Sequence, residues 1–241
     1  MQQGQSQHQM MGYDRSSIMF SPDGRLLQVE YAKKTVRQGT SALGVVCKDG
    51  VVLMADKRIA EKLIISRSLE KIYKVDEHIG ATASGMLSDG RVLIEKAQLI
   101  AQQHRVTYDE PIGTLTLVKD ICDMKQFFTQ YGGARPFGVS ILFAGVNDNP
   151  ELFVTDPTGI FFEYKATAIG EGEIELKEFL DKNYKDNLSL EEGIKLAARA
   201  LKKVLGKEYD INRIDGAYIS TKDKKFIRIP KDKLKVAWLY L

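Results

Sequence analysis

The spacing of apolar residues changes along this chain in blocks, and that order limits the folds the chain can adopt. Between Leu26 and Val36, apolar residues recur at three- and four-residue intervals, which predicts a helix over about 22–37. From Thr40 the pattern changes to short apolar runs typical of strands. Two helices, more strands, two further helices and a closing pair of strands follow.

The expected strands are short apolar runs bounded by turn residues. They cover 42–47, 51–55, 63–66, 71–75, 79–84, 137–146, 152–155, 160–168, 215–221 and 225–229. Asp49-Gly50 between the first two runs is a strong hairpin signal. The later helices are expected at 88–104, from Leu117 to a stop at Gly132-Gly133, at 174–182 and at 190–205. The last of these begins with a Ser189-x-x-Glu192 capping box.

Helices that arrive in consecutive pairs argue against a doubly wound parallel sheet, and strands joined by hairpins form antiparallel sheets. A continuous apolar run such as 139–146 indicates a strand covered on both faces. The sequence therefore predicts an α+β fold, a four-layer α/β/β/α sandwich in which each of two antiparallel sheets carries a helix pair. We expect residues 40–241 to form one core domain. We expect residues 1–12, which are almost wholly Gln, Gly, Ser, His and Met, to be a mobile tail.

Composition excludes several classes of function. Thirty-five basic and 32 acidic residues leave a net charge of +3, which does not favour nucleic acid or membrane partners. No apolar run approaches the roughly 18 residues of a spanning helix, and the N-terminus does not resemble a secretory signal, so we expect a cytoplasmic protein. Two cysteines, Cys47 and Cys122, cannot build a disulfide framework, and each is expected to be a buried, inert thiol. The histidines, which we expect at the surface or in loops, lack metal-ligand spacing, so no metal or cofactor is predicted.

One group of residues could carry chemistry. An N-terminal threonine can act as nucleophile and base together, because its free α-amine, with a pKa of about 8, can take the hydroxyl proton. Thr40 after Gly39, with Asp56 and Lys71 nearby in the pattern, would fit such a site if the chain were cut after Gly39. As an internal residue, Thr40 has an amide nitrogen without basicity, so the site is silent.

Several motifs together resemble the proteasome α subunits, most closely the archaeal form. They are Tyr13-Asp14-Arg15, the run 20–32 from Phe20-Ser21-Pro22-Asp23-Gly24 to Tyr31-Ala32, Gly39-Thr40-Ser41-Ala42-Leu43-Gly44, 49–56, Ser68-Leu69-Glu70-Lys71-Ile72, Thr82-Ala83-Ser84-Gly85, 131–140 and 163–170. The resemblance covers roughly residues 10 to 230. A helix before the first strand is the feature that marks an α rather than a β subunit.

The resemblance implies the fold of the N-terminal nucleophile hydrolases without their catalysis. It implies a homo-heptameric α ring stacked on rings of proteolytic β subunits in an α7β7β7α7 barrel. The α ring would admit unfolded polypeptides and dock a regulatory ATPase ring or another activator through the activator's C-terminal tails. Residues 1–12 would then be a gate, and 13–39 the pore rim and first helix.

The resemblance also implies three groups of site residues. The gate residues are Tyr13, Asp14, Arg15, Pro22 and Tyr31. The activator-docking pocket is formed by Lys71, Gly85, Met86 and Gly39, the last also expected to end the first helix with a positive φ. The inner constriction of the pore is formed by Tyr131, Gly132 and Gly133; an ordinary helix C-cap is the alternative role for these residues, and the two roles are compatible.

Two rival functions remain open at this point. The first is a threonine protease with residues 1–39 as a propeptide, which the helix within that segment argues against. The second is a general scaffold that never meets a protease. The chain also departs from the archaeal pattern in a longer tail before Tyr13 and in an apolar end, Trp238-Leu239-Tyr240-Leu241. Its last three residues have the hydrophobic-Tyr-any form that the resemblance implies for activator tails, but a packed helix or strand is expected for this end.

Overall fold

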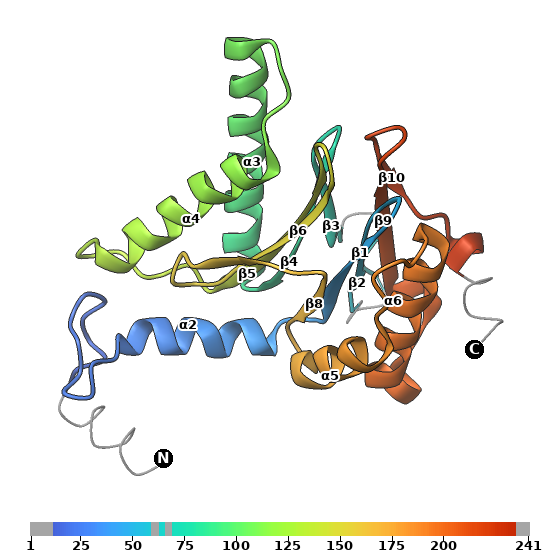
Figure 1. Ribbon diagram of the computed structural model, residues 1–241. Helices are drawn as coiled ribbons and strands as arrows, with labels where there is room; N and C mark the ends of the chain where they lie inside the picture. Colours follow the sequence, from blue (N-terminus) through green and yellow to red (C-terminus); the bar gives the residue numbers. More distant parts are fainter. Residues whose placement is uncertain (1–11, 59–62, 66–68, 235–241) are drawn as a thin grey trace.

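The strands of the chain form two antiparallel sheets in a computed structural model that describes residues 12–58, 63–65 and 69–234 (Figure 1). The first sheet has the order β10-β9-β2-β1-β8 and the second the order β3-β4-β5-β6-β7. The strands of the first are β1 (Ala42–Cys47), β2 (Gly50–Asp56), β8 (Ala166–Ile169), β9 (Ile214–Ser220) and β10 (Phe226–Arg228). Those of the second are β3 (Ile72–Asp76), β4 (Ile79–Gly85), β5 (Val139–Val146), β6 (Pro150–Thr155) and β7 (Phe161–Glu163).

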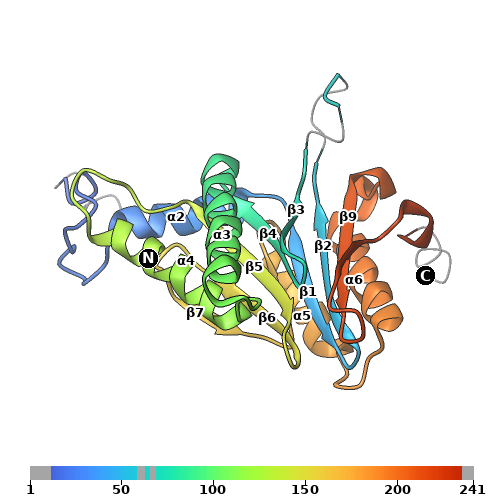
Figure 2. The ribbon, with the colours of Figure 1, turned by 90° about the horizontal axis from the view of Figure 1, so that it is seen from above.

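Helix pairs cover the outer faces of both sheets, as the order of elements predicts. The helices α3 (Leu87–Tyr108) and α4 (Thr114–Gln130) pack on the β3–β7 sheet, and α5 (Glu173–Asn183) and α6 (Leu190–Leu205) pack on the other. Figure 2 shows the resulting layers side by side, helices, sheet, sheet and helices. The four-layer sandwich is confirmed.

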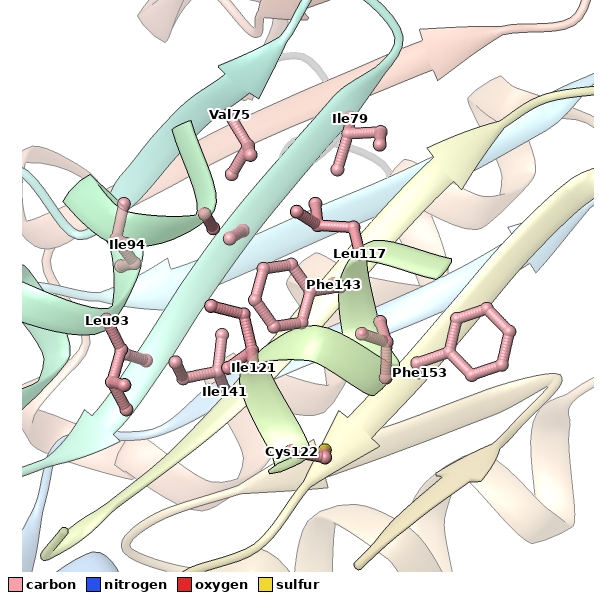
Figure 3. Packing of buried hydrophobic residues seen from close by; sticks show 14 of the residues in the cluster. Val75, Ile79, Leu93, Ile94, Leu117, Ile121, Cys122, Ile141, Phe143 and Phe153 are labelled. Carbon is pink, nitrogen blue, oxygen red and sulfur yellow. The ribbon is translucent and has the colours of Figure 1, made fainter. Parts of the chain in front are cut away.

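Three apolar clusters hold the layers together. One lies between α3, α4 and their sheet and includes Phe143, Leu117 and Ile121 (Figure 3). A second lies between α5, α6 and the other sheet, and the third fills the space between the two sheets. Because each sheet is covered on both faces, β5 is buried along its whole length.

The first helix, α2 (Leu27–Gln38), is part of this packing rather than an appendage. Its buried face consists of Leu27, Val29, Ala32 and Val36, and it packs against β4 and β5. The helix starts later than the periodicity predicts, because Ser21 and Gly24 form a turn. In that turn Gly24 N donates to Ser21 O at 2.8 Å, and Gly24 has a φ of +71°.

Two strand predictions are wrong. The run 160–168 is two strands: β7 pairs with β6 in one sheet and β8 pairs with β1 in the other, because the chain crosses between the sheets after Glu163. Apolar spacing does not reveal the partner of a strand, so this change of sheet was hidden. Leu63–Ile65 forms a turn and bend instead of a strand. Residues 1–11 of the expected tail and the whole apolar end lie outside the described residues.

Candidate functional site

A small pocket beside the start of α3 brings together three residues of the expected docking site. Lys71, Gly85 and Met86 line it, together with Tyr73, Ala83, Ser84, Leu87, Gly90 and Val139. Its volume is only about 10 Å³, which is room for about one water molecule. The pocket of a single chain is therefore too small for a peptide.

Lys71 is the charged group of this pocket. Its side chain comes from the residue before β3, where Thr82 Oγ1 donates to Lys71 O at 2.8 Å and ties it to β4. Lys71 is 4% exposed, and no hydrogen bond or ion pair links its ammonium to a described residue. Burial lowers the pKa of Lys71 to about 8; the charge of Asp56 opposes this shift and that of Arg58 adds to it. Among the described residues, the ammonium of this largely buried side chain therefore has no hydrogen-bonding or ion-pair partner.

Two glycines allow the backbone to pass close to this pocket. Gly85 has a φ of +117°, and a Cβ there would lie 2.2 Å from Gly138 O. Gly39 does not line the pocket but lies directly behind it, where a Cβ would lie 2.2 Å from Gly85 N. The positive φ expected of Gly39 is wrong, because its φ is −70°. Lack of space, not backbone conformation, requires glycine at this position.

The residues of the threonine site considered above lie near this pocket, but Thr40 and Asp56 make other hydrogen bonds. Thr40 O accepts a hydrogen bond from Ser84 Oγ at 2.9 Å, and its nitrogen belongs to the peptide bond with Gly39. The fully buried carboxylate of Asp56 accepts from Arg213 Nε at 3.0 Å and Nη2 at 2.7 Å. Asp56 is therefore paired with Arg213 rather than with a nucleophilic side chain.

The expected gate residues are only partly brought together within one chain. Gln28 Nε2 donates to Asp14 O, and the Tyr31 hydroxyl approaches Asp14 Oδ2 to 3.5 Å, so Asp14 lies against α2. Pro22 is exposed on the turn before α2, and Tyr13 is half-buried.

The expected constriction follows α4 and lies beside the rim. Tyr131, 57% exposed, stacks on Phe127 with ring centroids 5.3 Å apart. Gly133 has a φ of +87°, so these glycines form a turn after the helix rather than its cap, which is Tyr131. Arg15, Gln28, Gly132 and Gly133 line one hollow together with Ser16, Ser17, Ile18, Ala134 and Arg135. The structure thus places residues 15–18 beside residues 132–135.

Sequence reasoning missed the polar contacts that join these regions. Asp89 is a buried carboxylate that binds Arg135, although the sequence suggested only a helix start there. Arg135 lies within the 131–140 motif, but nothing in the motif names its partner. His78, expected at the surface or in a loop, is buried, with Nε2 2.8 Å from Ile112 O.

The described residues offer no reactive thiol and no cluster of metal ligands. Both cysteines are buried as predicted, and burial raises the pKa of each thiol to about 12. No group of three His, Cys, Asp or Glu side chains that could hold a metal occurs in the described part of the chain. No helix there is long and apolar enough to cross a membrane.

Comparisons with known proteins agree with the resemblance seen in the motifs. A family model described as proteasome subunit matches residues 36–219. A second model, which describes the N-terminal signature of A-type proteasome subunits, matches residues 13–34, which include most of α2.

Relatives named as proteasome alpha subunits align over nearly the whole chain. That of Thermococcus sibiricus is 52% identical over 92% of this chain and 85% of its own length. That of Archaeoglobus fulgidus is 50% identical over 93% of this chain and 92% of its own length. That of Methanocaldococcus jannaschii is 50% identical over 92% and 85%.

Proposed function

The chain belongs to the proteasome α-subunit family, and on that premise we propose that it is the non-catalytic, gate-forming subunit of a 20S core particle. Seven copies form a ring that stacks on proteolytic β subunits, giving an α7β7β7α7 barrel in the cytoplasm. Unfolded polypeptides enter through the α ring, and a regulatory ATPase ring or another activator docks on it. Neither nucleic acid nor a membrane is a partner.

The packing of α2 is the observation that carries this proposal. Four apolar side chains of α2 are buried against the sandwich, and the helix leads directly into Gly39 and Thr40. A segment packed in this way serves as part of the fold and not as a propeptide. With its nitrogen in a peptide bond, Thr40 lacks the free amine that would activate its hydroxyl.

The Lys71 pocket supports docking of an activator tail. An ammonium on a largely buried side chain that has no hydrogen-bonding partner among the described residues favours an incoming carboxylate, and the C-terminus of a peptide supplies one. The absence of a side chain at Gly85 lets a peptide backbone approach. Because the pocket of one chain is very small, a neighbouring copy in the ring supplies the remaining walls.

The rim and constriction support the gate. Asp14, Gln28 and Tyr31 fix the proposed rim segment on α2, while Arg15 lines one hollow together with Gly132 and Gly133. Residues 13–39 therefore form the rim and its supporting helix, and residues 1–12 act as the gate.

Native mass spectrometry and a peptidase assay on the purified chain test the proposal together. The expected result is a ring of seven chains of 27.1 kDa each that does not hydrolyse fluorogenic peptides. Mixing with the β subunit of the same organism should then give a barrel that does. Cleavage by the α chain alone, or an intact mass that begins at Thr40, would establish the threonine-protease alternative. Rings that never bind β subunits would favour the general scaffold.

A further inference from the structure

A closed set of hydrogen bonds ties the first turn of α3 to the segment that precedes β5. Arg135 donates to Asp89 through both ends of its guanidinium, with Nη1 2.7 Å from Oδ2 and Nη2 2.8 Å from Oδ1. Gly138 N donates to the same carboxylate at 2.8 Å, and Gly138 O accepts from Met86 N at 2.9 Å. We call Met86, Asp89, Arg135 and Gly138 the α3 junction.

The α3 junction lies between two parts of the proposed entrance. On one side, Met86 lines the Lys71 pocket. On the other side, Arg135 lines the hollow that contains the constriction glycines and Arg15. The junction also touches α2, because a Cβ on Gly138 would lie 3.5 Å from Thr35 Cγ2. It is thus a direct physical connection from the pocket to the pore loop.

The ion pair at its centre is asymmetric. The Asp89 side chain is 9% exposed and lies in the first turn of α3, where the helix dipole favours a carboxylate, whereas Arg135 is 53% exposed. Burial raises the pKa of Asp89, but the hydrogen bonds from Arg135 and Gly138 outweigh it and leave the pKa below its usual value. Asp89 therefore stays charged at neutral pH, and loss of Arg135 would strip a buried carboxylate of two donors.

We propose that Asp89 and Arg135 are positioning residues that transmit occupation of the Lys71 pocket to the 131–133 loop. The inference rests on the proposed docking function. A tail that enters the pocket displaces Met86, and the bond from Met86 N moves Gly138. Because Arg135 binds Asp89 through two hydrogen bonds, a movement of α3 also moves the 131–133 loop. Linkage makes this coupling reciprocal: the factor by which an occupied pocket shifts the equilibrium between the conformations of the loop equals the factor by which that change of the loop alters the affinity of the pocket for a tail.

Hydrogen exchange measured on the assembled α–β particle tests the junction itself. The amides of Met86 and Gly138 both donate hydrogen bonds within the α3 junction, so their exchange reports on it directly. In Arg135→Met these two amides should exchange about tenfold faster than in wild type. Arg91→Met is the matched control: Arg91 lies on the same helix in an exposed pair with Glu95, and its loss should leave both amides unchanged. Unchanged exchange at Met86 and Gly138 in Arg135→Met would overturn the proposal.

A second arm tests transmission with a synthetic peptide that ends in a hydrophobic-Tyr-any sequence with a free carboxylate. In wild type, the peptide should alter exchange over 131–133, and its C-terminally amidated form should not. Arg135→Met should bind the peptide but lose the response of the loop. Arg135→Lys, which keeps the charge without the planar fork, should respond weakly. Asp89→Asn keeps the shape of the side chain and should repeat the loss if Arg135→Met does not fold.

The outcomes separate the inference from the docking proposal. A loop response in Arg135→Met equal to wild type rejects the junction while docking stands. Peptide binding to wild type without any response at 131–133 does the same. If the wild-type particle does not bind the peptide, docking fails, and the inference that rests on it fails with it.

Discussion

Two buried lysines differ in their partners, and that difference assigns them different roles. Lys71 has no hydrogen bond from its ammonium to a described residue. Lys125 of α4 is fully buried, and its ammonium donates to Val139 O, Thr155 Oγ1 and Asp156 O. Three donors meet three acceptors, so Lys125 is a structural link between α4 and its sheet. On the proposed function, Lys71 is the lysine that would pair with a ligand carboxylate.

The pH dependence of docking follows from Lys71. Its pKa of about 8 means that the ammonium loses its proton as pH rises through 8, so carboxylate binding should be strongest below that pH and weaken above it. The Kd of the same fluorescently labelled peptide for the particle, measured from about pH 6.5 to pH 9.5, should rise by up to about tenfold per pH unit above 8. Lys71→Arg keeps its charge over this range and should flatten the curve. A wild-type Kd independent of pH would exclude Lys71 as the carboxylate ligand.

Replacement of Lys125 affects stability. Lys125→Met leaves three buried acceptors without this donor and should lower the free energy of unfolding at pH 7 by about 1–3 kcal/mol, measured by urea titration.

Burial lowers the pKa of Lys125 to about 8, so between pH 8 and about 10 the unfolded chain binds a proton that the folded chain has released. Between pH 8 and about 10, the free energy of unfolding of the wild type should therefore increase relative to that of Lys125→Met by about 1.4 kcal/mol per pH unit. Lys119→Met, an exposed change on the same helix, serves as control. A constant gap would mean that Lys125 keeps its proton.

At the scale of elements, the end of α2 is fixed by backbone contact. Gly39→Ala would force a Cβ against Gly85 N, so either α2 or β4 must shift. We expect a loss of about 1–3 kcal/mol in the free energy of unfolding and weaker ring formation, measured by urea titration and native mass spectrometry. Gln38→Ala, the exposed neighbour, should change neither. Wild-type behaviour of Gly39→Ala would show that the close approach is not required.

Local chemistry made some elements predictable. The capping box of Ser189 and Glu192 starts α6, and the Asp49-Gly50 signal joins β1 to β2. Contacts between distant residues were not predictable in the same way. Asp56 and Arg213 meet across 157 positions, and Asp89 meets Arg135 across 46, with no local pattern to reveal either pair. The residues of the docking pocket came from the resemblance alone, and only the structure gives the burial of Lys71.

At the scale of the whole molecule, the proposed gate predicts a difference between substrates. Deletion of residues 1–12 from the assembled particle should speed degradation of a casein-like unfolded polypeptide several-fold, because the obstruction at the entrance is removed. Hydrolysis of a short fluorogenic peptide, which needs less space, should change much less and serves as the control. Equal rates of casein degradation with and without these residues would refute the role of the tail.

The crossing between β7 and β8 has a mechanical consequence. Tyr164 N bonds to Leu152 O in one sheet, while the next residue, Lys165, accepts from Val46 N in the other. The two layers are therefore joined covalently at this edge. At the opposite edge the chain reaches β3 from β2 only through the longer connection 57–71, and β10 is held to the other sheet by hydrogen bonds, such as those from Phe226 N to Glu77 O and from Arg228 Nη2 to Ile72 O. Thermal breathing should consequently pivot about Tyr164 and Lys165, and the sandwich should begin to open between β3 and β10.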